Sequence, residues 1–158
     1  VSGKTVPLHP MYAYCTESLD HVELDSRIEV PSESMLDTLG QYTAAVVVAD
    51  RWYQHAQQTI TYSLSFIPIE VIARLQIDLN DQQQLLEFLE HTSYDESHHF
   101  YRSCTYSTSG NFTAKNYKLS SQDSFLLVFE NIYDQDHQLL MTNKHYIPCD
   151  LFKIDLYI

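Results

Sequence analysis

The chain has 158 residues, of which 44% are hydrophobic and 13% aromatic, and its formal net charge is −12. This apolar content is sufficient for a buried core, so the composition excludes a chain that is disordered throughout. With nine Lys and Arg against 21 Asp and Glu, we predict that the chain binds neither nucleic acid nor anionic lipid, since both require clustered cations. No apolar run reaches about 18 residues, so no membrane-spanning segment is predicted.

The cysteines and one N-glycosylation sequon give information on the cellular compartment of the protein. Cys15, Cys104 and Cys149 are widely spaced without a C-x-x-C pair, so neither a zinc ribbon nor a thioredoxin-type site is indicated. One disulfide plus a free thiol, and three reduced thiols, are both compatible with this spacing. The sequon at residues 111–113 favours the secretory route. The chain begins at Val1, which suggests a trimmed or processed protein and leaves room for a removed signal peptide or anchor.

The first half of the chain is expected to contain a lead-in, a short helix and strands. Residues 1–26 read as irregular, and Ser32 can cap a brief helix that Gly40 ends. A continuous apolar run within 42–53 predicts a strand buried on both faces. In 59–67, alternation predicts that the apolar side chains face inward and that Thr59, Thr61, Ser63 and Ser65 face outward. Further strands are expected over 27–30 and 71–79.

The second half contains one amphipathic helix and several further expected strands. Asn80 can cap a helix that ends near His91. The strands are expected over 98–107, 112–119, 125–132, 139–147 and 151–158. About seven to eight strands joined by short turns predict a mainly β protein, an antiparallel β-sandwich with one or two short helices. No internal repeat or linker is visible in the sequence, so residues 1–158 are expected to form a single domain.

The densest ionisable cluster follows the predicted helix. His91, Asp95 and His98 are the residue types that bind transition metals, and a helix-to-strand turn could bring them together. The other interpretation is a solvated polar loop in which His91 is favourable at the helix C-terminus. Asp134 and Asp136 are separated by one residue at a predicted hairpin tip. Turn formation explains these two aspartates better than calcium binding does.

Catalytic and cofactor signatures are missing from the sequence. There is no G-x-S-x-G elbow for a nucleophilic serine, and three glycines cannot form a phosphate-binding loop. We therefore predict no cofactor, and a non-enzymatic function is favoured over an enzymatic one.

The last third of the chain resembles the end of GOLD-type domains, which are luminal β-sandwiches of membrane-trafficking proteins. The resemblance rests on Gly110-Asn111-Phe112, on Tyr117-Lys118-Leu119, on the strand from Asp123 to Asn131, and on the alternating segment that ends at Ile158. It implies a non-enzymatic domain in the secretory-pathway lumen or outside the cell that binds a protein partner, and it transfers no catalytic residues.

The sequence is compatible with three functions. The first is a binding or assembly module for a protein partner, as the ectodomain or luminal part of a larger membrane-associated protein. The alternative is a barrel or sandwich that binds a small ligand. The third is a metal-dependent enzyme that uses the histidine-rich turn. A ligand-binding domain would differ from an interaction module by an internal site in place of a filled core and an exposed patch.

Overall fold

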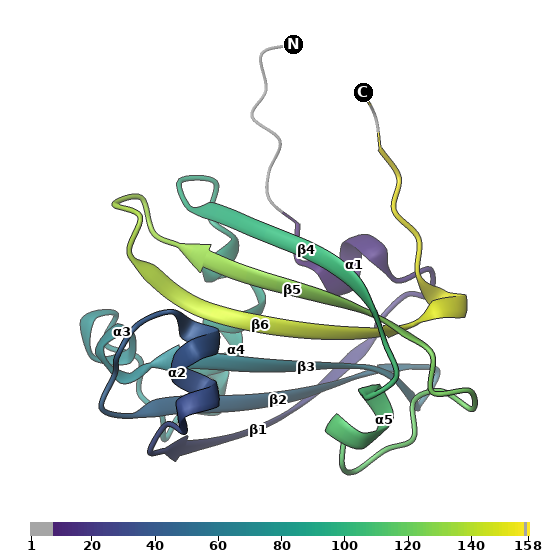
Figure 1. The fold of residues 1–158 in the computed structure, drawn as a ribbon, viewed down its shortest axis with the longest axis horizontal. Coiled ribbons are helices and arrows are strands. Elements are labelled where there is room, and N and C mark those ends of the chain that lie inside the picture. Colours follow the sequence, from purple (N-terminus) through teal and green to yellow (C-terminus); the bar gives the residue numbers. More distant parts are fainter. Residues whose placement is uncertain (1–7, 157) are drawn as a thin grey trace.

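A computed structural model describes residues 8–156 and 158, and its centre is one sheet of six antiparallel strands in the order β1-β2-β3-β6-β5-β4 (Figure 1). The strands are β1 (His21–Glu29), β2 (Val46–His55), β3 (Gln58–Pro68), β4 (His99–Ser107), β5 (Phe125–Tyr133) and β6 (Leu139–Pro148). The helices are α1 (Pro10–Tyr14), α2 (Glu33–Leu39), α3 (Ile69–Arg74), α4 (Gln82–Glu90) and α5 (Gly110–Thr113), with 3₁₀ turns η1 (Thr92–Tyr94) and η2 (Cys149–Leu151). The prediction of a mainly β, antiparallel protein is confirmed.

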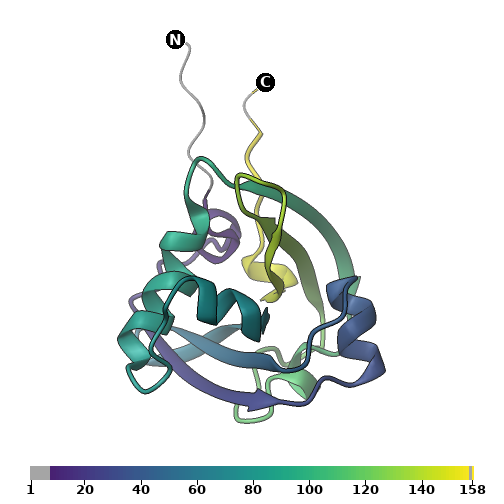
Figure 2. The same ribbon diagram turned by 90° about the vertical axis from the view of Figure 1, so that its left-hand side faces the viewer.

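The strands form one curved sheet, and not the two facing sheets of a sandwich. Figure 2 shows that the sheet curls around α1, α3 and α4, which lie on its concave side, while α2 lies outside. Helices therefore occupy the place that a second sheet would fill, and they bury the apolar side chains of that face. Among the described residues, no helix is long and apolar enough to cross a membrane.

The element order repeats within the chain. The first half runs β1–α2–β2–β3–α3 and the second runs β4–α5–β5–β6–η2, with α4 and η1 between them. In both halves the last strand ends at a proline, Pro68 or Pro148, that begins the next helix. The halves meet where β3 pairs with β6, centred on the pair of Leu64 and Lys144. The repeat lies in the architecture, and the sequence shows no sign of it.

Both faces of the central strands are buried. On the concave face, Val47, Ala49 and Ile67 pack against Leu85 and Phe88 of α4. On the convex face, one cluster lies under α2 and another lies beside α5; their buried members are Leu39, Val46, Val48, Phe66 and Leu139, and Trp52, Tyr62, Ala114, Phe125 and Tyr146. The expected burial of β2 on both faces is confirmed.

Local signals explain the helix over 33–39. The Ser32 side chain accepts a hydrogen bond from the backbone N–H of Met35, and Gly40 ends the helix with φ +69°. A residue with a Cβ is disfavoured at that dihedral, so glycine suits the position. The helix predicted after Asn80 is also present as α4, but Asp81 is the residue that caps it.

Three segments predicted as strands are not strands. Residues 71–79 lie beyond the last pair between β2 and β3, Val46 with Pro68, so no neighbouring strand continues there and α3 forms instead. Residues 112–119 begin in α5 and continue as a loop. The Asn111 side chain holds this loop by hydrogen bonds to the backbone of Leu119 and Ser120. Conversely, the lead-in expected to be irregular contains α1 and the start of β1.

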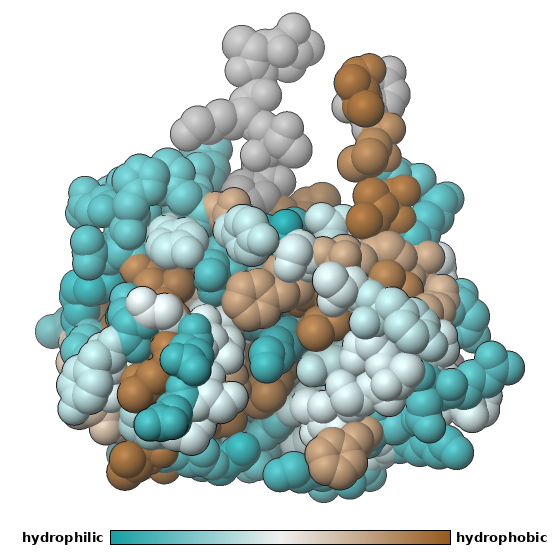
Figure 3. All heavy atoms as spheres, in the orientation of Figure 1, coloured by the Kyte–Doolittle hydropathy of each residue, from teal (hydrophilic) through white to brown (hydrophobic). Residues whose placement is uncertain are grey.

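In the third segment, 151–158, the described residues make one isolated β-bridge, between Cys15 and Phe152. Its alternating apolar residues Ile154, Leu156 and Ile158 are exposed, as the brown spheres along the C-terminal arm show (Figure 3). Period-two alternation predicted a strand there, but the described residues of this segment join none of the six strands of the sheet. All three cysteines are free thiols in this structure.

Candidate functional site

A row of polar side chains crosses the centre of the concave face. It runs along paired positions of five strands: Arg102, Glu130, Asn143, Ser65, and the neighbouring pair Ser63 and Arg51. All but Arg102 have relative exposures of 0%. Because β-strands place alternate residues on one face, the row shares its face with the apolar core under α4.

Glu130 is the centre of one half of this row. Its Oε1 accepts hydrogen bonds from Tyr94 Oη at 2.6 Å, Asn143 Nδ2 at 3.0 Å and His145 Nε2 at 3.1 Å. Its Oε2 accepts from Arg102 Nε at 2.6 Å. Since His145 Nε2 donates to the carboxylate, Nδ1 is the acceptor for the Ser63 hydroxyl at 2.6 Å.

Arg51 and Glu90 form the centre of the other half. Arg51 Nη1 lies 2.5 Å from Glu90 Oε2, and both side chains are buried. Tyr53 donates to the same oxygen at 2.9 Å, and Tyr12 donates to Glu90 Oε1 at 2.9 Å. His9 Nε2 lies 2.7 Å from Glu90 Oε2. Glu90 ends α4, so this helix and α1 bring the acidic and imidazole groups onto the sheet.

Ser65 and Asn143 join the two halves. Arg51 Nη2 donates to Ser65 Oγ at 2.6 Å, and Ser65 Oγ donates to Asn143 Oδ1 at 2.5 Å. Asn143 in turn donates to Glu130, so hydrogen bonds run without a break from Glu90 to Glu130. Within the described residues, two buried atoms on or near this network, Arg51 Nε and Thr61 Oγ1, have no hydrogen-bond partner.

The network holds both glutamates charged. Burial alone would raise the pKa of Glu90, but the adjacent His9 imidazole and the charge of Arg51 outweigh it and hold that pKa well below its usual range. Burial likewise opposes ionisation of Glu130, and the hydrogen bond from His145 with the charge of Arg102 lowers its pKa well below the usual range. Burial lowers the pKa of His145 to about 4, so its contact with Glu130 is a hydrogen bond from a neutral ring.

Such a network is costly to stability. Moving an ion pair out of water costs a desolvation free energy that the attraction between the two charges barely offsets. Apolar side chains of the same volume are therefore often as stabilising or more so. Clusters of buried, hydrogen-bonded charges with shifted pKa values are typical of functional sites. The central row is therefore the candidate site, and its donors and acceptors are suited to binding a small polar molecule.

A surface pocket reaches this site at Glu90. Its volume is about 400 Å³, and it is lined by Tyr12 of α1, by Leu19, Asp20, His21 and Val22, and by Gln83, Leu86, Glu87, Glu90 and His91 of and after α4. Tyr12 and Glu90 belong both to the pocket wall and to the buried network. The pocket is thus an entrance on the side where α1 meets α4.

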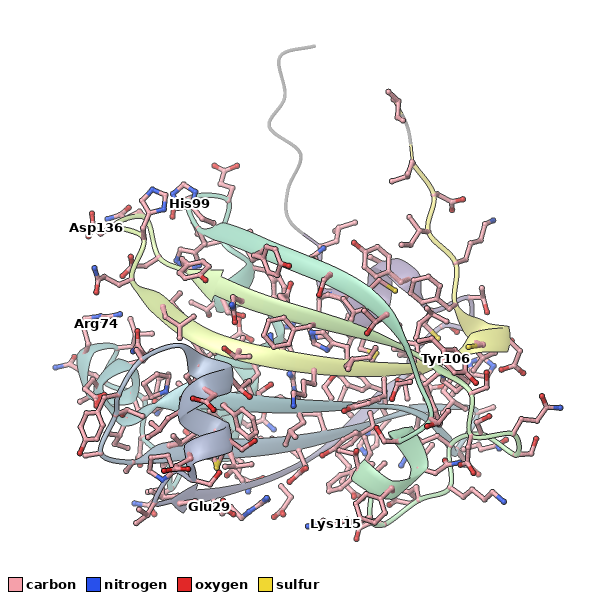
Figure 4. All side chains as sticks on the ribbon, in the orientation of Figure 1. Glu29, Arg74, His99, Tyr106, Lys115 and Asp136 are labelled. Atoms are coloured by element: carbon pink, nitrogen blue, oxygen red, sulfur yellow. The ribbon has the colours of Figure 1, made fainter. Side chains whose placement is uncertain are left out.

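A second pocket, of about 380 Å³, lies on the other face between β1 and the segment after α5. Figure 4 labels two of its lining residues, Glu29 on β1 and Lys115 after α5. Of its two cations, Arg27 is already paired with Glu29 at 2.5 Å and with Asp50 at 2.7 Å. These groups satisfy one another at the surface, so the pocket is a weaker candidate than the buried row.

Most of the residues singled out in the sequence lie away from the candidate site. Asp95 and His98 line a pocket of about 310 Å³ with Asp134 and Asp136, while His91 lines the entrance pocket. Figure 4 places Asp136 at the same end of the sheet as His99. Among the described residues, no group of three or more His, Cys, Asp or Glu is arranged to hold a metal ion. Metal binding by His91, Asp95 and His98 stays a prediction.

Sequence reasoning missed the site because it assigned polar strand residues to solvent. Ser63 and Ser65 were expected to face outward, and both are fully buried. That expectation is wrong because both faces of β3 are covered. One signal was present: Arg51 lies two residues after the apolar run that predicts a doubly buried strand, and Asn143 and His145 interrupt another apolar segment. A charge in a doubly buried strand must be paired inside the protein.

Comparison with known proteins finds relatives by structure alone. No protein-family model and no curated protein matches the sequence. A GntR-family transcriptional regulator from Enterococcus faecalis V583 has a TM-score of 0.68 at 12% identity, over 87% of this chain and 100% of that chain. The ligand-binding domain of a GntR-family regulator from Bordetella bronchiseptica has a TM-score of 0.62 at 11% identity, over 93% and 98%. The effector-binding domain of the Bacillus subtilis trehalose repressor has 0.61 at 14%, over 87% and 96%.

These likenesses show the fold, and they correct several expectations. The resemblance to GOLD-type domains is wrong, because the similar structures are domains of transcriptional regulators. The extracytoplasmic or luminal location, which depended largely on that resemblance, is corrected for the same reason. The protein-partner function is corrected as well, because two of these structures are described as a ligand-binding and an effector-binding domain. This chain spans 58% and 60% of two longer regulators that it matches.

Proposed function

We propose that this chain is a ligand-binding domain that takes up a small polar molecule at the central row of the concave face. The observation that carries the proposal is the hydrogen-bonded path from Glu90 through Arg51, Ser65 and Asn143 to Glu130, which is buried, charged and connected to an entrance pocket. Two similar structures are described as a ligand-binding and an effector-binding domain, which supports this choice over a protein-binding module.

In the full protein, we propose that ligand binding regulates transcription, because the similar structures are described as transcriptional regulators or their domains. The negative charge of this chain makes it a poor DNA-binding surface by itself. That it binds no nucleic acid stays a prediction, and contact with DNA would belong to another part of such a protein.

The proposal is tested by thermal shift of the purified chain against a panel of small polar metabolites, followed by calorimetry of each hit. Ser65→Ala and Tyr12→Phe change the row and its entrance, and each is expected to weaken binding by about tenfold, the loss of one good hydrogen bond. Thr38→Ala on α2 is the matched control, because its hydroxyl bonds only its own helix at the surface.

Thr38→Ala should bind like the unaltered chain. A hit whose affinity Ser65→Ala and Tyr12→Phe leave unchanged would place the ligand elsewhere and contradict the site. A folded chain that no compound in the panel stabilises would contradict the function.

A further inference from the structure

His9, near the start of the described chain, lies inside the candidate site. Its Nδ1 accepts a hydrogen bond from the backbone N–H of Met11 at 3.1 Å, so the proton is on Nε2. Nε2 lies 2.7 Å from Glu90 Oε2, and 3.2 Å from both Arg51 Nη1 and Tyr53 Oη. The imidazole therefore donates to Glu90 from a position where it also contacts the network's cation.

Short elements hold this imidazole in place. The helix that follows it, α1, has five residues, and its buried member Met11 packs against Tyr53 and Ile147. Before it, the Leu8 carbonyl accepts a hydrogen bond from Arg102. A segment so short gains little helical stability by itself, so it depends on these contacts with the site. None of the residues of α1 belongs to a strand of the sheet.

The charges of the entrance favour a nitrogen-borne donor. Of the residues that line it, Asp20, Glu87 and Glu90 are acidic, and none is Lys or Arg. An anion entering here would meet only like charge before it reached Arg51, whose Nη1 is already paired with Glu90. A protonated amine or a heterocyclic N–H instead meets acceptors along the whole path.

We propose that the Glu90 subsite, which His9 fills, recognises a nitrogen-borne proton donor of the ligand, either a protonated amine or a heterocyclic N–H, and that the ligand binds by displacing His9. The inference rests on the proposed function and names the ligand chemistry of the same site. Displacement of His9 also releases α1 and the Leu8 contact with Arg102. Ligand binding is thereby coupled to the segment that precedes the sheet.

Chemical rescue tests the subsite without knowledge of the natural ligand. In the full 158-residue chain, His9→Gly removes the imidazole and leaves Glu90 without that donor, which should lower the melting temperature by about 4–8 °C. Imidazole at tens of millimolar should then raise the melting temperature of His9→Gly by about 3–5 °C through binding to the folded state. Methylamine is the second probe and should act in the same direction, whereas acetate and glycerol should not.

His55→Gly is the matched control, because His55 lies at the end of β2 with its ring at the surface, 3.3 Å from Glu17. Neither His55→Gly nor the unaltered chain should respond to imidazole at these concentrations. If acetate stabilises His9→Gly as much as imidazole does, or if nothing does, the inference is overturned.

If the His9→Gly variant shows no cooperative unfolding transition, a second measurement is used. Refolding the variant in imidazole should restore the transition and refolding in acetate should not; failure of imidazole would overturn the inference. The result of the rescue experiment can be told apart from a failure of the proposed function. A metabolite panel without hits contradicts the function and does not change the rescue result. Failed rescue contradicts the Glu90 subsite and leaves ligand binding at the central row intact.

Discussion

Arg51 on β2 and Glu130 on β5 lie in different halves of the chain and are joined through only two side chains. Arg51 donates to Ser65, Ser65 donates to Asn143, and Asn143 donates to Glu130. The bond between Ser65 and Asn143 crosses from β3 to β6, where the two halves meet. A change at either charged residue therefore alters the hydrogen bonding of the other.

Arg51→Met should destabilise the protein strongly. Glu90 would lose its buried cation at 2.5 Å, and the removal of one partner of a buried pair costs about 3–5 kcal/mol. Urea denaturation at pH 7 measures the loss. Arg74→Met is the control, since Arg74 makes a half-exposed pair with Asp134 at 3.5 Å and such pairs contribute about 0–1 kcal/mol. Equal losses in the two variants would contradict the central role of Arg51.

Tyr94→Phe should remove one of the donors to Glu130 while the ring remains stacked on Phe100, 5.8 Å away between ring centroids. A hydrogen bond to a buried charge contributes about 1.5–3 kcal/mol, and this is the expected loss in free energy of unfolding. The Tyr94 donor helps to hold the pKa of Glu130 low, so the variant should also begin to unfold at a higher pH during acid titration. Tyr101→Phe, at an exposed position of β4, should change neither quantity.

Stability should fall as the pH drops from about 6.5 towards 4. Burial lowers the pKa of His145 from its usual 6.5 to about 4, so within this window the unfolded chain binds a proton that the folded chain does not. Protonation thus favours unfolding, and the contribution lost is roughly 3 kcal/mol. The pKa values of Glu90 and Glu130 are held low, so their contribution is lost only below about pH 4.5.

Urea midpoints measured between pH 7 and 4.5 test the role of His145. His145→Gln should flatten the pH dependence in this interval, because the group responsible for it is gone. The control His55→Gln changes a surface histidine and should keep the slope of the unaltered chain. A slope that persists in His145→Gln would assign the pH dependence to other groups.

How much could be predicted depends on whether the deciding contact is local. Ser32 and Gly40 bracket α2 within one segment, and the sequence predicted that helix correctly. Residues 71–79 were predicted as a strand, but the segment begins within α3 because strand pairing ends at Val46 with Pro68. The sequence of one segment does not reveal whether a neighbouring strand is there to pair with it. The site was missed for the same reason: Ser63 and Ser65 alternate like solvent-facing residues, but both are fully buried among residues distant in the sequence.

Gly110→Ala should destabilise the junction between β4 and α5. A Cβ at this position would lie 2.6 Å from Cγ and Cδ2 of Phe125, a ring that is fully buried beside Trp52. Overpacking of this kind costs about 1–3 kcal/mol, because neither ring nor backbone can move freely. Gly40→Ala is the comparison: nothing lies within 4 Å, but φ is +69°, so its cost of about 1–2 kcal/mol comes from the backbone.

The two glycine variants should differ in their response to a smaller neighbour. Adding Phe125→Leu to Gly110→Ala makes room for the methyl group, so the double variant should be more stable than the sum of the single changes predicts. Adding it to Gly40→Ala should give simple additivity, since the two positions share no contact within 4 Å. Urea denaturation of the three single and two double variants measures the coupling, and additivity in the Gly110 pair would mean that the Phe125 ring does not limit this site.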